Sequence, residues 1–373
     1  MSTHTMMPLG RFLAEYKDRN DGNLHKPVAV GRYGIRTRES IYSKELAKDY
    51  SKNKLIYKDT LTIGMGSKQI DIGILSTDEV FSVSPAYHTF RISGISSDYL
   101  RYCLECRNED MSKRFMVASA RQGKTVDIKR WKEYLIPVYD EDSQADIVRR
   151  LDKVSAAIES LQAQYDKLEE VVKSRFIEMF GDPTDNPYGW DKIPLGERCD
   201  IVTGNTPSRA DPENYGDFLE WIKSDNINTP STFLTKAEEY LSEVGFAKCR
   251  YVESGSVLMT CIAGSINCIG NVAVANRRVA FNQQINAIVP DEDEPLYIYW
   301  LMMLSKPFIQ STVNMALKGI LSKSKLAALA FPFPPIAKQR EFVSFVEAID
   351  KSKLVVLIAI RICETMKQGG RSL

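Results

Sequence analysis

Apolar residues recur at heptad spacing in one long stretch near the middle of the chain. Between Ser143 and Phe180 they are separated alternately by four and three residues. These positions are Ile147, Leu151, Val154, Ile158, Leu161, Tyr165, Leu168 and Val172. A heptad kept over more than three repeats predicts a supercoiled helix that packs against a second helix. At 1.5 Å rise per residue this helix would be on the order of 55 Å long.

The same pattern returns 195 residues later, close to the end of the chain. Its positions are Phe342, Val346, Ile349, Lys353, Val356, Ile360 and Cys363. Lys353 is the one charged residue in this second seam. We expect the two helices to pair with each other in antiparallel fashion, because each one follows a globular segment. An intermolecular coiled coil is the alternative.

Short motifs repeat at a similar offset, which indicates an internal duplication of about half the chain. Pro8-Leu9-Gly10 returns as Pro194-Leu195-Gly196. Ile136-Pro137 aligns with Phe331-Pro332, and Gln144 aligns with Gln339. Each half therefore reads as a domain that ends at a proline and passes into a long helix.

Within each half, short β-branched runs are bounded by glycines and turns and are followed by a helix. The expected strands are 59–63, 70–75 and 88–92 in the first half, and 255–262, 269–275, 278–282 and 285–289 in the second. The helices that follow are 97–107 and 296–304. The predicted fold class is α+β, with two mixed α/β domains in pseudo-twofold repeat, separated by two long antiparallel coiled-coil helices. The predicted boundaries are 1–142 and 183–335 for the domains, and 143–182 and 336–373 for the helices.

Composition is that of an ordinary globular protein of two or three domains, with 44% hydrophobic residues in 373 and a net charge of +1. The longest apolar run, Leu354–Ile360, is far shorter than the roughly 20 residues of a membrane span. The N-terminal residues show no signal-peptide pattern, so we expect a cytoplasmic protein. The odd number of cysteines, seven, favours reduced thiols. Cys103 and Cys106 have no second pair at zinc spacing and are expected to be buried thiols.

A search for catalytic constellations finds none. Asp185–Tyr188 only faintly resembles the target-base motif of amino-methyltransferases, and no glycine-rich cofactor loop accompanies it. Gly64-Met65-Gly66 lacks the third glycine of a dinucleotide site, and there is no P-loop. The acidic run Asp291–Glu294 is expected in a surface loop before a helix. The chain has only three histidines, too few to favour a histidine-based active site or metal centre. The sequence therefore favours a binding protein with no bound metal.

Basic residues gather in local patches although the chain is almost neutral. Residues 113–132 hold seven basic residues and one acid, Asp127. Such patches suit local contact with phosphates, although a solvated lysine-rich face is the alternative for any one of them.

The chain resembles the specificity subunit of type I restriction-modification enzymes over essentially its whole length. The matching segments, in order, are Ile136–Val138, Arg175–Asp182, Leu195–Glu197, Thr203–Ser208, Trp221–Asp225, Gly264–Ser265, Gly270–Ala273, Phe281–Asn286 and Phe331–Pro335. The first half departs from this pattern, since it lacks the Thr203–Ser208 loop and the tryptophan-containing strand. The tail Gly369–Leu373 also departs from it.

The resemblance implies a non-catalytic subunit that recognises double-stranded DNA. Each domain would read one half of a bipartite target, and the helices would set the spacing between the halves. Unlike halves predict an asymmetric target. The implied partners are two methyltransferase subunits and two restriction-translocase subunits. S-adenosylmethionine and ATP would bind those partners, with no cofactor in this chain.

The candidate DNA contacts are polar and basic residues in predicted loops, where we expect them to be exposed. In the first half they are Arg36, Arg38, Lys52, Lys54, Arg121 and Lys124; in the second they are Thr206, Ser208, Arg209, Lys223, Lys318 and Lys323. The loop with Lys318, Gly319 and Lys323 parallels the one with Arg121, Gly123 and Lys124. Two alternatives stay open: a protein-only coiled-coil scaffold, and a methyltransferase-type enzyme with unrecognised motifs.

Overall fold

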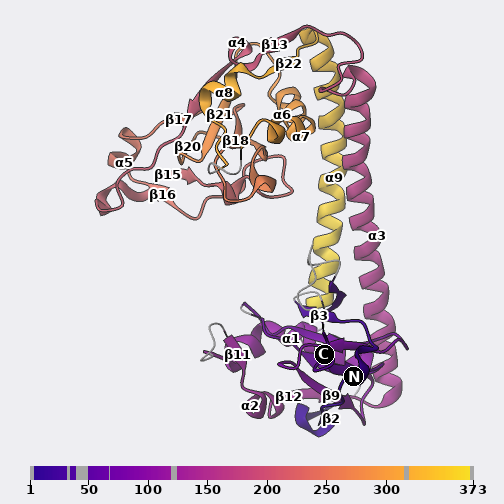
Figure 1. The fold of residues 1–373 in the computed structure, drawn as a ribbon. Coiled ribbons are helices and arrows are strands. Elements are labelled where there is room, and N and C mark those ends of the chain that lie inside the picture. The colour runs from indigo at the N-terminus through magenta and orange to yellow at the C-terminus, as the bar shows by residue number, and fades with distance from the viewer. Residues whose placement is uncertain are drawn as a thin grey trace. The chain divides into compact units, whose positions relative to one another are not determined.

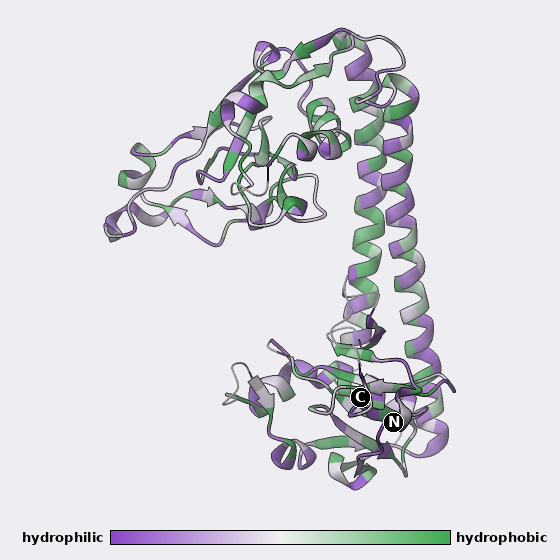
Figure 2. Ribbon diagram, viewed as in Figure 1, coloured by the Kyte–Doolittle hydropathy of each residue, from purple (hydrophilic) through white to green (hydrophobic). Residues whose placement is uncertain are grey.

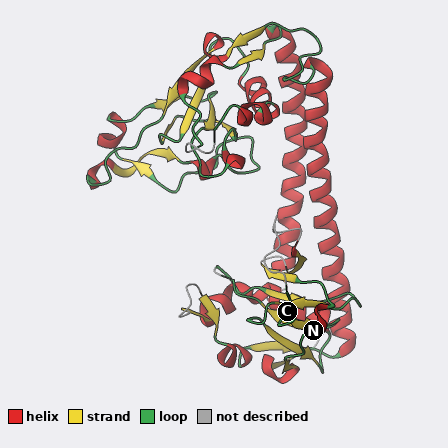
Figure 3. Ribbon diagram, viewed as in Figure 1, coloured by secondary structure: helices red, strands yellow, loops and turns green. Residues whose placement is uncertain are grey.

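The computed structural model describes residues 4–31, 34–38, 49–66, 68–118, 124–314 and 319–369. The chain folds into two compact units, Met1–Gln162 with Leu357–Leu373, and Ala163–Val356. Two long helices, α3 (Glu141–Phe180) and α9 (Ile336–Gly369), contribute residues to both units (Figure 1). The rest of each unit mixes strands with short helices (Figure 3). The predicted α+β fold class is confirmed. The units divide the long helices between them, whereas the sequence-based boundaries treat each helix as a separate segment.

The first unit is built on an antiparallel sheet with the strand order β2-β9-β6-β7. Smaller strand pairs, β1–β12, β3–β4, β5–β8 and β10–β11, surround it. Its elements are β1 (Thr5–Pro8), η1 (Leu9–Phe12), β2 (Leu13–Tyr16), η2 (Asp21–Asn23), β3 (Val28–Gly31), β4 (Gly34–Thr37), β5 (Lys54–Ile56), β6 (Thr60–Ile63), β7 (Ile72–Ile74), β8 (Phe81–Val83), β9 (His88–Ile92), α1 (Ser97–Phe115), β10 (Met116–Ala118), β11 (Lys124–Val126), α2 (Ile128–Lys132) and β12 (Leu135–Val138).

The second unit is built on an antiparallel sheet with the strand order β14-β21-β18-β19, next to a mixed sheet with the order β16-β15-β20-β17. Its elements are β13 (Lys192–Pro194), α4 (Leu195–Arg198), β14 (Cys199–Thr203), η4 (Pro212–Asn214), β15 (Tyr215–Ile222), η5 (Ser224–Asn226), β16 (Tyr240–Leu241), α5 (Glu243–Ala247), β17 (Tyr251–Val252), β18 (Val257–Thr260), η6 (Ile266–Cys268), β19 (Val272–Val274), β20 (Val279–Phe281), β21 (Ile285–Pro290), α6 (Pro295–Leu304), α7 (Lys306–Ser311), α8 (Lys323–Ala328) and β22 (Ala330–Pro332).

The two four-stranded antiparallel sheets have the same topology and register. Thr60 of β6 faces Arg91 of β9, and Val257 of β18 faces Ile288 of β21. Both members of the second pair lie 197 residues after those of the first. The predicted strands of both halves are present, and the helix expected at 97–107 continues to Phe115.

The duplication also includes the tryptophan-containing strand β15, for which the sequence of the first half showed no counterpart. In the second unit β15 runs parallel to β20, with Trp221 opposite Ala280. In the first unit Pro27, just before β3, forms a parallel bridge to Ser82 of β8. Since β8 corresponds to β20, Pro27 stands where the second unit has Trp221, which explains why no tryptophan marks this strand.

The long helices pair in antiparallel fashion within the chain. In the second unit the ring centroids of Phe176 and Phe342 are 5.3 Å apart, and the Lys353 ammonium lies 5.6 Å from the Tyr165 ring. Moving toward the N-terminus of α3 therefore moves toward the C-terminus of α9. All predicted seam positions are buried or partly buried. Figure 2 shows apolar and polar residues alternating along both helices. The intramolecular pairing predicted from the heptads is confirmed.

Aromatic side chains join α3 and α9 to the core of the second unit. Phe176 stacks on Tyr297 of α6 at 5.6 Å, and Phe180 meets the same ring edge-on at 5.1 Å. The core of the first unit includes Phe90 and Trp131, whose rings are 6.3 Å apart. The end of α3 is thus part of a globular core as well as of the helix pair.

In the acidic run before α6, Asp291 and Glu292 are exposed as predicted, but Asp293 is not. Asp293 is buried and accepts two hydrogen bonds from the Arg198 guanidinium, at 2.8 and 2.9 Å. This charge is held inside because the bidentate geometry compensates for its loss of hydration. All seven cysteines are free; Cys103 is buried and Cys106 is partly buried. Within the described ranges, no helix is both long and apolar enough to cross a membrane.

Candidate nucleic-acid interface

Several loops of the second unit gather at one end of its antiparallel sheet. The register pairs Thr203, the last residue of β14, with Asn286, and Thr260, the last of β18, with Ile285. The loops that follow β14 and β18 and the turn that precedes β21 therefore meet there. Backbone hydrogen bonds tie them together, from Cys261 N to Gln284 O (2.8 Å) and from Asn205 N to Phe281 O (3.0 Å). We call these segments (204–208, 261–264, 282–284 and 319–323) the sheet-end loops.

Gly204 shows why the loop after β14 needs a glycine. A Cβ at this position would lie 2.3 Å from the carbonyl oxygens of both Phe281 and Asn282. No ordinary side chain fits at that distance, so the loop approaches the turn before β21 only because residue 204 lacks one. The Thr203–Ser208 segment thus has a packing role as well as exposed polar groups.

The helices that follow the two predicted basic loops begin at equivalent positions of the two units, and residues 319–323 of the second loop are described. Ile320 bridges Ile262, and Leu321 N donates to Cys261 O at 2.9 Å, which brings this segment to the sheet end. Ser322 then caps α8, as Asp127 caps α2 exactly 195 positions earlier. Lys323 is exposed at the start of α8. Arg121 and Lys318 lie outside the described residues, as does the side chain of Lys124, whose backbone belongs to β11.

Exposed hydroxyl and amide groups dominate the sheet-end loops. The Thr206 hydroxyl hydrogen-bonds Gln283 Oε1, and the Ser224 hydroxyl donates to Gln284 Oε1 at 3.4 Å. Gln283 and Gln284 are exposed in the turn between β20 and β21. The sequence reading placed this segment among the central strands and missed the amides. Two adjacent glutamines between two β-branched runs were the available signal.

Arg209 and Lys223 converge on one carboxylate that sequence reasoning missed. Glu239 pairs with Lys223 Nζ at 2.6 Å and with Arg209 Nη2 at 2.8 Å. Hydrogen bonding from Lys223, and then from Arg209, lowers the pKa of Glu239 although partial burial opposes the shift. The Arg209 guanidinium also lies 5.2 Å from the Tyr215 ring. Glu239 therefore holds the cations of Arg209 and Lys223 in place and neutralises part of their charge. Ser208 is exposed, and its hydroxyl accepts from Ala210 N at 3.2 Å.

Among the described residues, the predicted contacts of the first unit differ in their exposure. Arg36 and Lys52 are exposed, and the Arg38 guanidinium lies 5.2 Å from the Tyr50 ring. Lys54 contradicts its prediction as a surface contact. It is only 7% exposed, and its ammonium donates to Tyr87 O. Burial lowers the pKa of Lys54, and its contact with Tyr87 O joins β5 to the segment that follows β8.

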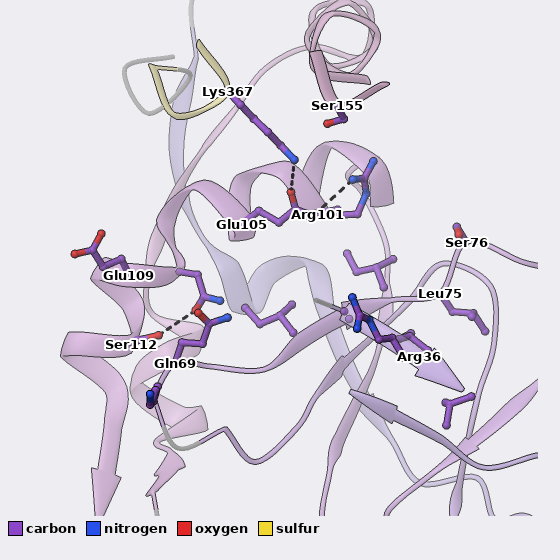
Figure 4. Close-up of a pocket in the computed structure, with 18 of the residues that line it drawn as sticks. Arg36, Gln69, Leu75, Ser76, Arg101, Glu105, Glu109, Ser112, Ser155 and Lys367 are labelled. Atoms are coloured by element: carbon purple, nitrogen blue, oxygen red, sulfur yellow. Dashed lines mark hydrogen bonds and ion pairs between the residues drawn. The ribbon is translucent and has the colours of Figure 1, made fainter. Parts of the chain in front are cut away.

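Arg36 lines a groove of about 1280 Å³ between β4, β7 and the helices of the first unit (Figure 4). Most cations in this groove are already paired. Lys367 lies 3.2 Å from Glu105, which also receives Arg101 at 3.6 Å, and Lys113 lies 2.8 Å from Glu109. Lys68, beside Gln69, is exposed and makes no ion pair among the described residues.

The chemistry of these surfaces is that of hydrogen bonding and charge. Thr, Ser, Asn and Gln side chains on short pinned loops can donate to and accept from base edges, and lysines and arginines can hold phosphates. Among residues that the structure describes, no group of three or more histidine, cysteine or acidic side chains is arranged to hold a metal ion.

Comparison with known proteins places this architecture in a class. Residues 187–357 match the model of the type I restriction modification DNA specificity domain. The specificity subunit of the type I restriction enzyme HindI from Haemophilus influenzae is 31% identical over 119 residues. That match covers 31% of this chain and 25% of the relative, so it spans about a quarter of the relative's length.

Two solved structures share the fold over nearly the whole chain. One, from a study of complex assembly and conformational transition of the type I restriction-modification system, gives a TM-score of 0.53 at 17% identity and covers 98% of this chain and 96% of its own. The S subunit from M. genitalium gives 0.50 at 13% identity, with 99% and 95% covered. The resemblance expected from the sequence is confirmed: residues 187–357 are similar to the type I DNA specificity domain, and the chain has the fold of type I specificity subunits.

Proposed function

We propose that this chain is the DNA-recognition subunit of a type I restriction-modification complex, acting in the cytoplasm. Each unit reads one half of a bipartite, asymmetric target. Adenine methylation and cleavage are carried out by partner subunits, and this chain is not catalytic. A protein-only scaffold or an intact methyltransferase has no particular observation in its favour.

The observation that carries this proposal is a repeated framework with different sheet-end loops. The turn before β21 holds Asn282, Gln283 and Gln284, whereas the equivalent turn before β9 holds Pro85 and Ala86. A scaffold that keeps the same sheet but changes the exposed groups at its end is suited to reading two different half-sites. The polar groups of Thr206, Ser208 and Lys323 belong to the same end in the second unit.

Partner docking on the helices is supported by apolar residues that the helix pair does not cover. In the first unit, α9 exposes Leu357, Ile358, Ile362 and Met366. Exposed apolar side chains spaced by about four residues along a helix are typical of a surface that packs against another helix. We propose that two methyltransferase subunits dock here and that two translocase-nuclease subunits join them. S-adenosylmethionine and ATP bind those partners.

The test is modification-sensitive long-read sequencing of the host genome, with and without this gene. The expected result is a bipartite methyladenine motif with an unread spacer, which is lost on deletion and restored by complementation. If the neighbouring methyltransferase is expressed and no such motif depends on this chain, the proposed function is wrong.

A further inference from the structure

The second half of α9 is apolar on more than one side. It contains the longest apolar run of the chain, Leu354–Ile360. Ile360 is buried in the seam with α3, whereas Leu354, Val355 and Ile358 are 58, 66 and 51% exposed (Figure 2). Hydrophobicity alone does not define which face of such a helix meets a partner helix. Another feature must therefore specify the face and the partner of α9.

Lys353 is the charged residue in the seam of α9, and it is only 7% exposed. Its ammonium lies 3.6 Å from the Asp350 carboxylate and 5.6 Å from the centre of the Tyr165 ring on α3. A buried ammonium needs compensation for its lost hydration, and a carboxylate and an aromatic face both supply it. Asp350 belongs to α9 itself. Of these two groups, only Tyr165 therefore depends on which helix lies opposite.

The globular part of the second unit encloses this stretch of the seam. Tyr299 of α6 is buried, and its electrostatic neighbours include Glu169 of α3 and Asp350 of α9. Burial raises the pKa of Tyr299 to about 12, so its phenol is neutral at physiological pH. Glu169 is paired with Lys173 of the same helix at 3.3 Å. The seam around Asp350 and Lys353 thus lies between α3, α6 and α9.

The duplicated position of the seam is aliphatic. The register that pairs Tyr165 with Lys353 places Ile158 opposite Ile360, one heptad further along both helices. Ile158 and Ile360 are the residues 195 positions from Lys353 and Tyr165, respectively. If α9 met α9 of a second copy in the same register, Lys353 would therefore lie opposite Ile360 and not opposite an aromatic ring. That arrangement would bury two ammonium groups against aliphatic side chains, which is costly.

We propose that Lys353 and Tyr165 determine the partner of α9, favouring α3 of the same chain over α9 of a second copy. A single polar residue in a helix seam can specify register and oligomeric state at some cost in stability. Disfavouring the wrong partner matters for α9, because its exposed apolar residues would otherwise promote self-association. This role is separate from DNA recognition and concerns the assembly of the chain itself.

The test compares the full-length wild type with two single variants, an exchange variant and a control. Lys353→Ile removes the charge, Tyr165→Ile removes the ring, and Lys353→Tyr/Tyr165→Lys exchanges them. Lys351→Ile is the control, because Lys351 is exposed on the same helix. Isotope-labelled and unlabelled chains are mixed in urea and refolded together. Carboxyl-directed cross-linking with mass spectrometry then measures links between Glu347 of one copy and Glu364 of another, two exposed residues that an α9–α9 pair would bring side by side.

We expect both single variants to increase these links between copies about tenfold, because neither keeps the charge facing the ring. The exchange variant and the control should match the wild type. Unfolding curves should separate the two single variants. Tyr165→Ile leaves the ammonium against an aliphatic chain and should lower the unfolding midpoint more than Lys353→Ile, which removes the charge.

Wild-type cross-linking in the folded single variants overturns the proposal. High cross-linking in the exchange variant also overturns it, since that variant keeps a lysine opposite a tyrosine. An equal increase in the control would show that loss of any lysine on α9 suffices, which likewise contradicts the proposed role. If one single variant does not fold, the other and the exchange variant decide the outcome.

Discussion

Gln144 and Gln339, 195 residues apart, make the same pair of hydrogen bonds in the two units. The Gln144 side chain accepts from Ser96 N at 3.0 Å and donates to Tyr139 O at 2.8 Å. Gln339 accepts from Glu294 N at 3.0 Å and donates to Pro334 O at 3.0 Å. Each glutamine thus ties the first turn of a long helix to the residues that precede it and to the start of the domain helix.

Replacing either glutamine with alanine should destabilise its own unit. Each change leaves buried backbone groups without partners, at a cost of about 1–3 kcal/mol. Gln339→Ala should cost more, because Gln339 also donates to the buried Asp293 carboxylate at 2.6 Å. Hydrogen exchange in increasing urea, resolved by peptide, measures each unit separately. Gln164→Ala, an exposed amide on α3, is the control. Equal loss of protection in both units would contradict the local role.

Gly204→Ala should disrupt the sheet-end loops. The added methyl group would meet two carbonyl oxygens at 2.3 Å, so the loop after β14 must move, at a cost of about 1–3 kcal/mol. We expect a lower unfolding midpoint and weaker DNA binding by the assembled complex. Gly264→Ala is the matched control, because an added Cβ there meets nothing within 4 Å. Similar behaviour of the two variants would rule out the packing argument.

Glu239→Gln should strengthen binding to non-specific DNA. The change removes one carboxylate and frees the cations of Lys223 and Arg209, which it now pairs at 2.6 and 2.8 Å. Two more cations available to phosphates should steepen the slope of log affinity against log salt by about 1–2. Fluorescence anisotropy over a salt series measures this. Glu253→Gln, which frees Arg278 beside the Tyr251 ring, is the control, and an equal change in both would place the DNA elsewhere.

Asp350 should make the second unit sensitive to pH. Burial raises the pKa of Asp350, although the Lys353 ammonium, 3.6 Å away, opposes the shift. A carboxyl whose folded pKa is raised favours folding while it is protonated, and this contribution is lost as pH rises through the folded pKa. Asp350→Asn should therefore raise the unfolding temperature at pH 7 more than at pH 4. Asp142→Asn, an exposed position on α3, should show no such difference. A pH-independent effect of Asp350→Asn would contradict the assignment.

The sequence by itself determined the features that depend on local periodicity. The heptads defined α3 and α9 and their seam, and the repeated Pro-Leu-Gly motif, with the aligned pairs Pro137–Pro332 and Gln144–Gln339, revealed the duplication. Strands 60–63, 72–74 and 88–92 followed from β-branched runs between turns. These patterns are readable because a helix or strand face is set by residues that are near one another in the chain.

Only the tertiary structure decided which polar residues are available to a ligand. The Lys54 ammonium donates a hydrogen bond to Tyr87 O. Glu239 forms ion pairs with two predicted DNA contacts, and Asp293 is buried in an ion pair with Arg198. Pro27 proved equivalent to Trp221 through its strand pairing alone. Each of these outcomes depends on groups 16 or more residues apart being brought within hydrogen-bond or strand-pairing distance. Local pattern carries no information on such pairs, because exposure and charge compensation are set by the packed fold.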